Sequence, residues 1–473
     1  MTSSPVQISG IFPSYAMQAG TEKPLNELGI GALMPWAGKL WAITYIAHTG
    51  KNAGLYSIDK DMHLERHPES VSGTFANRFM HAPSDSVIMG PHVIDGKGLV
   101  RTCGKLAEYR LAGTCQHLTD PDNKVYMLTM EGPFFEMDVN TLETRELCNL
   151  TYELQVHTEL TPGWTGKAAE AVSHTRNTPQ PHFKACHTGQ GRVYVTNNSY
   201  FDEDHSGKSA SGRLAEWDGK EWKVIRTGPF NEVTGRENFG EIIFAVGWDK
   251  ASAILMVRVN GKWDEYRLPK ASQTFEHCWQ TEWPRLREVQ HERYLLDASG
   301  MFYELSGWLL EGKLWGVRPI CSHLRVVADF CSFAGLLVMG DNQVSPIGNK
   351  WTVGEPQSNF WFGHIEDLWS WGKAKGWGGP WWKNEVKSGE SSSSYLMTGF
   401  DKKVMHLKSE SASAVRVRVE IDFVGNQNWC NYLTLDVDAN GYAHHVFPDG
   451  FSAHWIRFVA EGDATLTALL HYT

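Results

Sequence analysis

The sequence predicts an all-β globular protein, and its composition supports this fold class in three ways. The chain of 473 residues contains 20 Trp, 15 Tyr and 21 Phe, and aromatic residues are enriched in strands. It contains 45 Gly and few long runs of Ala, Leu, Lys and Glu, a pattern typical of short strands joined by tight turns. With 42% hydrophobic residues, the chain is able to bury one very large core or two ordinary ones.

One local pattern recurs along the chain: an alternating strand, a turn of Asp, Asn, Ser or Gly, and a second alternating strand. "GLYSIDKDMHLE" and "HVIDGKGLVR" are two examples. The pattern predicts β-hairpins, because alternation puts every second side chain on one face and these turn residues tolerate a positive φ. The turn residues of the repeats are Asp59, Asp95, Asp138, Asp218, Asn260, Ser306 and Asp341.

The spacing of these turns predicts a seven-bladed β-propeller over residues 25–385. Successive turn residues mostly lie 35 to 46 positions apart, which is the length of a blade of four strands. The interval from Asp138 to Asp218 is 80 positions, and the excess falls on the polar stretch 157–182, which contains Pro and Gly. We therefore expect 157–182 to be a loop inserted at one mouth of the propeller.

A second domain is predicted after the propeller. The Trp-rich stretch "WFGHIEDLWSWGKAKGWGGPWWKNE" is followed by the Ser-rich "VKSGESSSS", which is typical of a hinge. Strong alternation returns in "VMHLKSESASAVRVRVEIDF" and "ATLTALLHYT", but the turn spacing of the blades does not. We therefore expect residues 395–473 to form a small β-sandwich-like domain and not an eighth blade.

Charge and hydropathy exclude several classes of partner. The formal net charge of −10 and the absence of a clustered Lys and Arg surface argue against nucleic-acid binding. No run of about eighteen apolar residues exists, so no membrane span is expected. The start "MTSSPVQISG" has neither the charged nor the apolar region of a signal peptide. We expect a soluble monomer that corresponds to the mature form of a secreted or periplasmic protein.

The eight cysteines are scattered and form no CxxC pair, so a zinc-ribbon site is not predicted. Buried free thiols are one interpretation. In an oxidising compartment, Cys103 with Cys115 and Cys321 with Cys331 are each spaced to close a short loop. The other cysteines are Cys148, Cys186, Cys278 and Cys430.

Candidate site residues are expected far apart in sequence, because the loops of different blades converge at one mouth of a propeller. His92 follows a Gly-Pro pair at a strand start, and His117 lies near the next strand entry. Tyr200 and Arg213 lie in or after a polar loop. For each His taken alone, a hydrogen-bonded turn residue is the alternative. Further candidates for substrate binding are His182, His187, Arg258, His277, Trp279, Gln280 and Arg285.

The combination of His, Tyr and Arg favours β-elimination at a uronic acid. An Arg neutralises the sugar carboxylate, so that the C5 proton becomes acidic; a base then removes that proton, and an acid protonates the departing O4. Ordinary glycoside hydrolysis requires two carboxylates at a defined separation. Carboxylates such as Glu131, Asp202, Glu203 and Glu282 are present, but nothing in their spacing pairs them.

The sequence resembles a family of propeller enzymes over nearly its whole length. The matching stretches include "GIGALMPWAGKLWAITYIAHTG", "PESVSGTFANRFMH", "RLAEWDGKEW", "CWQTEWPRLREV" and "LMTGFDKKVMHL". They resemble the seven-bladed enzymes that act on L-rhamnose-α-1,4-D-glucuronate, which comprise rhamnose–glucuronate lyases and the α-L-rhamnosidases of glycoside hydrolase family 145. The propeller and its His, Tyr and Arg residues are more distantly similar to ulvan lyases.

The resemblance implies two alternative sites. For the lyases it implies His92, His117, Tyr200 and Arg213 as catalytic residues, and for the hydrolases it implies the single His48 in "ITYIAHTG". We favour the lyase, because it accounts for more of the residues present.

In this hypothesis the enzyme releases terminal L-rhamnose from side chains of arabinogalactan or gum arabic and leaves unsaturated glucuronate. Arg213, with Arg258 or Arg285, neutralises the carboxylate. Tyr200 and His92 serve as acid and base, and His117 orients one of them.

Two further expectations complete the interpretation. The partner is an acidic plant or algal polysaccharide, and the chemistry requires no cofactor. A structural calcium ion in the propeller channel is a further possibility, but the sequence contains no DxDxDG calcium-binding loop. The alternative to an enzyme is a non-catalytic carbohydrate-binding propeller whose Trp-rich loops stack on sugar rings.

Overall fold

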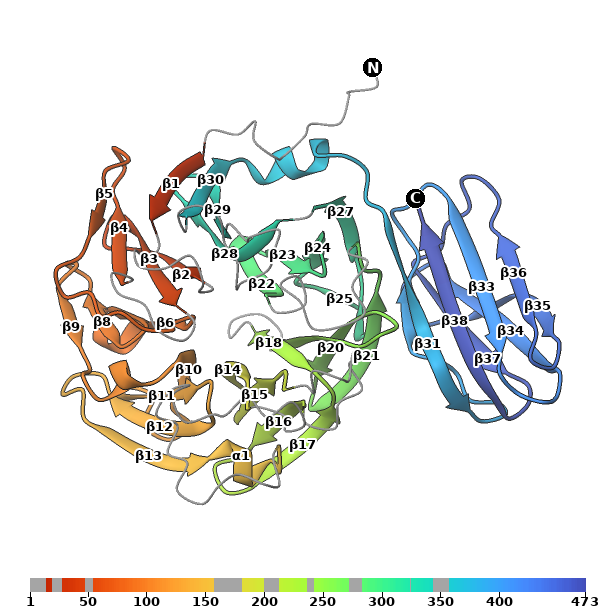
Figure 1. Ribbon diagram of the computed structural model, residues 1–473, viewed down its shortest axis with the longest axis horizontal. Helices are drawn as coiled ribbons and strands as arrows, with labels where there is room; N and C mark the ends of the chain where they lie inside the picture. The colour runs from red at the N-terminus through yellow and green to blue at the C-terminus, as the bar shows by residue number, and fades with distance from the viewer. Residues whose placement is uncertain are drawn as a thin grey trace. The chain divides into compact units, whose positions relative to one another are not determined.

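The computed structural model describes residues 14–18, 28–46, 54–156, 181–199, 212–235, 242–271, 283–323, 325–342 and 357–473. The chain divides into two compact units. The N-terminal unit comprises Ile11–Gly235 and Arg325–Ile365, and the C-terminal unit comprises Met1–Gly10, Arg236–Leu324 and Glu366–Thr473. Nearly all regular structure in both units is strand, which confirms the predicted all-β class (Figure 1).

The N-terminal unit is built from four-stranded antiparallel sheets in which consecutive strands are neighbours. The first sheet has β2 (Leu28–Trp36), β3 (Lys39–Ile46), β4 (Leu55–Ile58) and β5 (Leu64–Arg66), and the second has β6 (Arg78–His81), β7 (Ser86–Met89), β8 (His92–Asp95) and β9 (Val100–Thr102). The third has β10 (Leu111–Gln116), β11 (Lys124–Thr129), β12 (Pro133–Asp138) and β13 (Thr144–Asn149), and the fourth has β14 (Phe183–Gly189), β15 (Arg192–Asn197), β16 (Arg213–Trp217) and β17 (Trp222–Thr227).

A last sheet of this unit joins the two ends of the repeat. It consists of β28 (Val326–Phe333), β29 (Leu336–Asn342), β30 (Gln357–Gly363) and β1 (Ser14–Gln18). Strand β1 comes from the start of the chain, yet Ser14 pairs with Trp361 in an antiparallel ladder. Such a pairing fixes a sheet by hydrogen bonds between segments that are distant in sequence.

The first strands of neighbouring sheets in the N-terminal unit lie side by side. β2 contacts β28 and β6, and β10 contacts β6 and β14 (Figure 1). The segment that leads into β6 and strand β10 run in the same direction, as the parallel bridge between Phe75 and Leu111 shows. At the other end of β10, the hydroxyl of Thr188 on β14 donates to the Gln116 carbonyl at 2.5 Å. Four-stranded antiparallel sheets with parallel, adjacent first strands are the architecture of a β-propeller.

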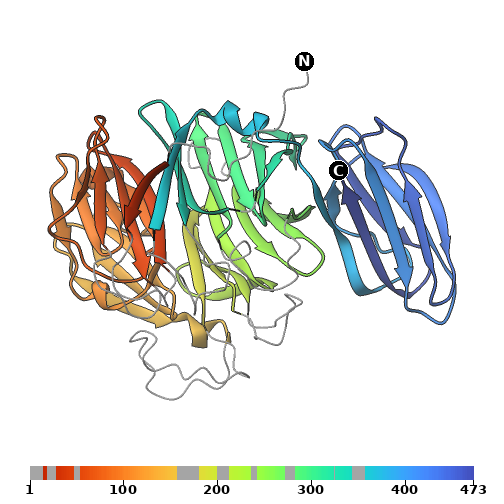
Figure 2. The same ribbon diagram turned by 45° about the horizontal axis from the view of Figure 1, so that its top comes forward.

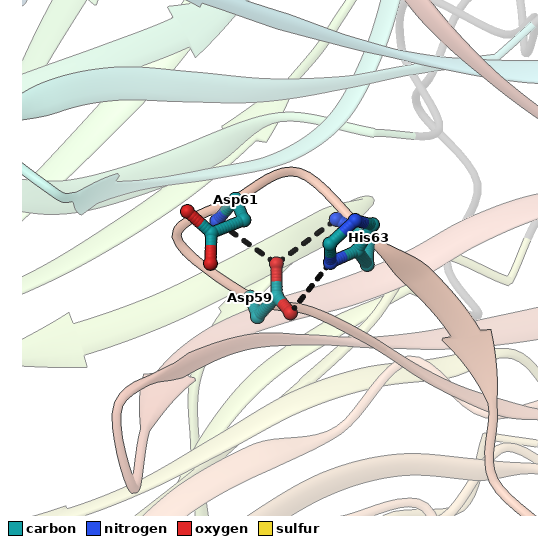
Figure 3. A group of neighbouring side chains, drawn as sticks. All are labelled: Asp59, Asp61 and His63. Atoms are coloured by element: carbon teal, nitrogen blue, oxygen red, sulfur yellow. Dashed lines mark hydrogen bonds and ion pairs between the residues drawn. The ribbon is translucent and has the colours of Figure 1, made fainter.

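The hairpins follow the predicted Asp turns. Asp138 lies at the end of β12, and its carboxylate oxygen Oδ1 accepts from the backbone N–H groups of Asn140 and Thr141, both at 2.9 Å. Asp59 makes the same kind of contact after β4 (Figure 3). A carboxylate that satisfies the backbone N–H groups of a tight turn explains why Asp recurs at this position. Asp95 at the end of β8 and Asp218 after β16 repeat the arrangement.

The last two predicted turns differ from the expectation. Ser306 ends β24 (Met301–Ser306), but a small extra hairpin of β25 (Leu309–Leu310) and β26 (Lys313–Leu314) follows before the next long strand. Asp341 lies inside β29 and not in a turn, so the seventh predicted turn is wrong. The strand before Asp341 is apolar (LLVMG), and strand pairing with β28 and β30 outweighs the turn preference of Asp.

The C-terminal unit contains further antiparallel sheets. β19 (Ile243–Trp248), β20 (Ala253–Val259) and β21 (Lys262–Leu268) form a meander, and the turn at Asn260 and Gly261 joins β20 to β21 as predicted. Strand β18 (Phe230–Gly235), which precedes them in the chain, belongs to the N-terminal unit. A separate sheet has the order β22 (Arg285–Gln290), β23 (Arg293–Ala298), β24 and β27 (Arg318–Ser322).

The last hundred residues form two sheets (Figure 2). One has the order β31 (Gly376–Val386), β38 (Ala464–Tyr472), β33 (Lys403–Ser409) and β36 (Tyr442–Val446). In the other, β32 (Ser394–Leu396) continues into β37 (Trp455–Ala460), β34 (Val415–Asp422) and β35 (Cys430–Val437). β32 also pairs in parallel with β21, so these strands share one hydrophobic cluster with β19–β24.

The described cysteines are free thiols, and the structure contains neither of the two short loops considered from the sequence. Cys103 donates to the Leu142 carbonyl at 3.6 Å. Cys115 of β10 instead lies beside Cys186 of the neighbouring sheet, and the two buried thiols interact. The free thiols agree with the interpretation of buried thiols, and five of them are buried: Cys103, Cys115, Cys186, Cys321 and Cys331. The short loops were an alternative from sequence spacing, which does not show which strands of neighbouring sheets are adjacent.

Among the described residues, no helix is long and apolar enough to cross a membrane.

Candidate functional site

The topology divides the predicted site residues of the N-terminal unit between two ends of its sheets. We call the end at which β6, β10 and β14 begin the entry end. In an antiparallel sheet, second strands end there and third strands begin there. The N–H of Phe183 at the start of β14 donates to the carbonyl of Met130 at the end of β11 at 3.0 Å, which ties two sheets together at this end.

The structure brings some of these residues to the entry end and not others. His92 begins β8, His182 directly precedes β14, and Arg213 begins β16, so all three lie at the entry end. His117 follows β10 and therefore lies at the opposite end. His187 is next to Thr188, whose hydroxyl contacts the end of β10, so it also lies toward the opposite end.

His92 is fully buried on the third strand of its sheet. Its Nδ1 lies 2.8 Å from the hydroxyl of Thr102 on β9, and its Nε2 is buried without a hydrogen-bond partner among the described residues. Burial, and to a smaller extent the neighbouring His67, lowers the pKa of His92 to about 4. The imidazole is therefore neutral at neutral pH. Gly90 has φ 56°, which explains why a glycine stands at this position, two residues before His92.

His117 has partners at both ring nitrogens. Its Nδ1 accepts from the backbone N–H of Asp120 at 3.0 Å, so Nε2 carries the proton of a neutral ring and faces Glu136 at 3.3 Å. The ring stacks on Tyr126 with centroids 4.3 Å apart. These contacts show that His117 is a hydrogen-bonded turn histidine, which the sequence analysis gave as the alternative to a catalytic role.

Arg213 holds the chain at the entry end. Its guanidinium donates to the carbonyls of Leu154 and Gln155 at 3.3 Å and of Gly212 at 2.8 Å. Leu154 and Gln155 directly follow the short helix α1 (Leu150–Glu153), so Arg213 joins this segment to β16. Burial lowers the pKa of Arg213, but an arginine remains charged in proteins.

A polar segment at the end of β15 lies against the start of β14. The N–H of His182 donates to the hydroxyl of Ser199 at 3.1 Å, and the N–H of Asn198 donates to the carbonyl of His182 at 3.0 Å. Asn197 accepts from the N–H of Ser199 at 2.6 Å, and its amide nitrogen is buried without a partner among the described residues. An amide donor is therefore available beside Arg213, whose β16 pairs with Asn197.

Buried carboxylates at the entry end are paired with arginines. Glu131, which the sequence offered as a hydrolytic acid, is fully buried and forms an ion pair with Arg110. Farther along the strands, Asp329 in the middle of β28 accepts from the N–H of Leu33 at 2.8 Å and pairs with Arg78 at 3.3 Å. The Arg78–Asp329 pair was not predicted, because no local motif connects residues so distant in sequence.

The C-terminal unit contains its own buried polar cluster. Arg285 at the start of β22 lies opposite Asp297 on β23 and packs over the ring of Trp283 at 5.0 Å. The Nε2 of His323 lies 3.0 Å from Asp297. Burial raises the pKa of Asp297, while His323 and Arg285 oppose this shift. Sequence reasoning identified Arg285 but missed the pair Asp297 and His323.

Two predicted substrate-binding residues, Arg258 and His187, are described by the structure but are not placed beside Arg213. Arg258 is buried on β20 opposite Ile243. Burial lowers the pKa of His187 to about 4. The other predicted residues lie outside the described part of the chain, as does most of the predicted loop: His48, Tyr200, His277, Trp279, Gln280 and residues 157–180.

One group of side chains has the composition of a metal site. Asp59, Asp61 and His63 present oxygen and nitrogen atoms within 4.8 Å of one another (Figure 3). The Oδ1 of Asp59 already accepts two backbone N–H groups, and its Oδ2 lies 3.1 Å from the Nδ1 of His63. Because equivalent Asp turns occur elsewhere in the unit, the contacts within this group are explained by the hairpin turn.

No protein-family model and no curated protein matches the chain. Several solved structures are similar to the chain, and the three described here have TM-scores below 0.5. The structure of U3-55K has 10% identity, covers 73% of this chain and 98% of its own, and gives a TM-score of 0.41.

Two further structures are comparable. The β-propeller domain of Cps50 (Swd1) from Myceliophteria thermophila has 9% identity, the same coverage of 73% and 98%, and a TM-score of 0.39. The exo-β-1,3-galactanase of Phanerochaete chrysosporium has 9% identity, covers 76% of this chain and 95% of its own, and gives a TM-score of 0.27. We draw no conclusion on function from similarities of this size. The strand topology itself defines the class, a protein of the β-propeller type.

Proposed function

We propose that the protein is an exo-acting polysaccharide lyase. It releases terminal L-rhamnose from L-rhamnose-α-1,4-D-glucuronate ends by β-elimination and leaves an unsaturated glucuronate. In this proposal residues 25–385 form a seven-bladed propeller that carries the site, residues 395–473 form an appended β-sandwich-like domain, and the protein is secreted or periplasmic.

One observation carries the proposal: a cation and hydrogen-bonding groups gather at the entry end of the sheet β14–β17. Arg213 begins β16, and the amide of Asn197 lies on the strand that pairs with it. His182 is tied to the same segment through Ser199. A fixed cation beside amide donors is suited to a sugar carboxylate, and neutralising that carboxylate is the first requirement of β-elimination.

The roles follow from the chemistry of each group. Arg213 neutralises the glucuronate carboxylate, and Tyr200, the residue after Ser199 in the chain, is the candidate proton donor or acceptor at C5 or O4. His117 is not included, because its ring nitrogens serve a turn at the other end of the sheets.

His92 is the second candidate for proton transfer. Its neutral ring is suited to accepting a proton, although a pKa of about 4 makes it a weak base. The sheet β10–β13 separates its sheet from the sheet of Arg213 along the chain. We therefore centre the reaction on Arg213 and Tyr200, and variants of His92 decide whether it takes part.

The test measures two products from a gum arabic arabinogalactan with terminal rhamnose. β-Elimination gives free rhamnose together with the ultraviolet absorbance of a C4=C5 unsaturated uronate, whereas hydrolysis gives rhamnose alone. We expect both signals from the wild type and neither from Tyr200→Phe. Release of rhamnose without this absorbance would overturn the lyase proposal and favour hydrolysis, and His48→Ala would then test the hydrolase alternative. If no sugar is released, the remaining hypothesis is a carbohydrate-binding propeller.

Arg213→Lys supplies a matched variant, because it keeps the charge and loses the planar guanidinium. We expect it to lose most of the turnover, and circular dichroism checks that the variant is folded, because Arg213 also holds Leu154 and Gln155 to β16. Arg226→Lys is its control, since Arg226 lies on the outer strand β17 and donates to the neighbouring Thr227 carbonyl.

A further inference from the structure

Two tryptophans lie on the outer face of the hairpin β25–β26 in the C-terminal unit. Leu309 of β25 pairs with Leu314 of β26; Leu314 belongs to the hydrophobic cluster of this unit, and Leu309 packs against it. Side chains alternate between the two faces of a hairpin, so Trp308 before Leu309 and Trp315 after Leu314 point away from the core. Their exposed fractions are 55% and 40%. The hairpin therefore presents two neighbouring indole rings to solvent.

The loop between β34 and β35 lies against this hairpin. The indole Nε1 of Trp315 donates to the carbonyl of Val424 at 3.1 Å, and the side-chain amide of Asn426 donates to the carboxylate of Glu311 at 3.1 Å. Gly425 allows this close approach, because a Cβ at its position would lie 2.7 Å from the Cδ1 of Trp315. The loop also carries two exposed apolar side chains, which together with the two indoles we call the aromatic patch: Phe423 and Val424.

Buried polar groups hold the hairpin and the loop in place. The carboxylate of Asp422 is fully buried and accepts from the backbone N–H groups of Gly425 and Gln427, both at 2.7 Å. The buried hydroxyl of Tyr266 accepts from the N–H of Leu314 on the hairpin at 3.2 Å and from the side-chain amide of Gln427 in the loop at 3.1 Å. The patch is therefore supported by an ordered backbone, so a ligand binds to it at little cost in conformational entropy.

The size of the aromatic patch fits a small ligand better than a second protein. From their exposed fractions, its four side chains present roughly 400 Å² to solvent, since a fully exposed aromatic side chain has roughly 150–250 Å². A stable interface between two proteins buries about 800 Å² on each partner. An apolar patch of this size on a monomer is often functional. We therefore infer a ligand site and not a dimer interface.

The polar groups beside the indoles favour a neutral sugar. Glu311 and Asn426 place a carboxylate acceptor next to an amide, which is the combination that neighbouring hydroxyl groups of a pyranose need. Glu311 forms no ion pair with the described residues, so its negative charge disfavours a uronate carboxylate at this place. Lys313, the cation of the same hairpin, is paired with Asp264 at 2.9 Å.

We propose that the aromatic patch binds neutral pyranose residues of a glycan, with their C–H faces on Trp308 and Trp315 and their hydroxyl groups on Glu311 and Asn426. The inference rests on the proposed function for the class of polymer, because the rhamnose–glucuronate ends of an arabinogalactan are attached to a neutral galactan. In galactose O4 is axial, so the opposite side of the ring presents the C–H groups of C3, C4 and C5. Such a face packs on an aromatic ring. The patch is a second contact with the polymer, besides the site of cleavage.

The test uses the full chain in affinity gel electrophoresis with a galactan in the gel. Periodate oxidation, reduction and mild acid hydrolysis of gum arabic supply a galactan without rhamnose–glucuronate ends, so binding at the proposed cleavage site does not contribute. We expect the galactan to retard the wild type, and Trp308→Ala and Trp315→Ala each to bind about threefold to tenfold more weakly, the loss that corresponds to one stacking contact. Trp315→Phe keeps a ring and should lose less.

Tyr442→Ala is the control for the loss of an exposed ring. Tyr442 is 58% exposed in the same unit and follows the end of β35 at Val437, whereas the loop of the patch precedes the other end at Cys430. A strand of this length spans roughly 25 Å. We expect Tyr442→Ala to be retarded like the wild type. Circular dichroism checks that every variant is folded, and the two tryptophan variants test the patch independently of each other.

Three outcomes of these gels overturn the proposal. The site is wrong if the galactan does not retard the wild type, or if it retards both tryptophan variants equally with the wild type. The assignment to a neutral sugar is wrong if polygalacturonate retards the wild type as strongly as the galactan does. If light scattering shows that the wild type is a dimer and Trp315→Ala a monomer, the patch is an interface between two copies.

Rhamnose release from gum arabic keeps this inference distinct from the proposed function. Retardation by the galactan without rhamnose release by the wild type supports the patch and overturns the lyase. Release of rhamnose and unsaturated uronate without retardation by the galactan supports the lyase and overturns the patch.

Discussion

Cys115 and Cys186 bring their thiols together from the first strands of two neighbouring sheets. Both side chains are buried, and burial, together with the neighbouring Cys115, raises the pKa of Cys186 well above its ordinary value. The strands are packed so closely here that a Cβ on Gly113 would lie 2.8 Å from the Sγ of Cys186. The thiol of Cys186 is therefore held in the protonated form, so a thiol oxidant reacts with it slowly and has to be given time to act.

We predict that oxidation by diamide links these two cysteines to each other. Each disulfide forms with the transfer of two hydrogens to diamide, which is reduced to the hydrazine. Since the linkage would close a loop of roughly 70 residues, it should raise the free energy of unfolding by about 4 kcal/mol. Peptide mass mapping identifies the linkage, and thermal unfolding measures the stabilisation.

Cys103→Ser is the control for this experiment. It leaves the Cys115–Cys186 contact intact, so the linkage should still form. A disulfide between Cys103 and Cys115 in the wild type, or stabilisation that disappears in Cys103→Ser, would contradict the assignment.

The Asp turns give a second prediction. Asp138→Ala removes an acceptor for two backbone N–H groups at 2.9 Å, and we expect it to lower the free energy of unfolding by about 1 kcal/mol, the size measured for comparable side-chain caps. Asp138→Asn retains an acceptor oxygen and should cost much less. Urea unfolding of the two variants measures the difference, and an equal loss in both would mean that the charge, not the acceptor, stabilises the turn.

The fold could be predicted to the extent that its signals are local. Alternation defines strands, and a turn Asp satisfies backbone groups only a few residues away, so most hairpins were recognised from short windows. Asp341 was misassigned because its strand is stabilised by pairing with β28 and β30, which no short window shows. The same holds for β1, whose partner β30 lies at the other end of the repeat.

A third prediction concerns His92 and pH. Its folded pKa of about 4 lies below the ordinary value of 6.5, because burial, and then His67, disfavours the charged ring. The unfolded chain therefore binds more protons between about pH 4 and 6.5, and stability falls as the pH falls through this window. The contribution is complete above about pH 6.5 and amounts to about 3 kcal/mol, as an order of magnitude.

His92→Gln should remove this contribution. We expect the melting temperature of the variant to fall less between pH 7 and pH 4.5 than that of the wild type, measured by differential scanning calorimetry. His63→Gln is the control, since this histidine is exposed in a surface turn. If the wild type and His92→Gln lose the same number of degrees over this range, His92 is not held neutral by burial.

The candidate site could be predicted only in part, for a physical reason. His92, His182 and Arg213 lie at the same end of their sheets, and the Gly-Pro pair marked the strand start correctly for His92. His117 also lies beside a strand, but its partner Glu136 is 19 positions away on another strand, and only the pairing of β10, β11 and β12 brings the two together. Hydrogen bonds between strands decide whether a histidine is available for chemistry, and composition does not report them.

The pair Asp297 and His323 gives a fourth prediction, on stability. Both side chains are buried, and they are 26 positions apart in sequence, with Nε2 and Oδ1 separated by 3.0 Å. Removing one partner leaves the other buried and unpaired, which typically costs about 3–5 kcal/mol. We therefore expect Asp297→Leu and His323→Leu each to lower the free energy of unfolding by about 3 kcal/mol or more in urea titrations.

The double variant tests whether the two residues act as a pair. Replacing both by leucine removes the unpaired group, so the loss should be clearly smaller than the sum of the two single losses. Arg285 lies opposite Asp297 and opposes the burial effect on its pKa, so some of the cost should remain in the double variant. Strictly additive losses would show that Asp297 and His323 stabilise the C-terminal unit independently, each through its own contacts such as the stacking of His323 on Phe302 at 4.6 Å.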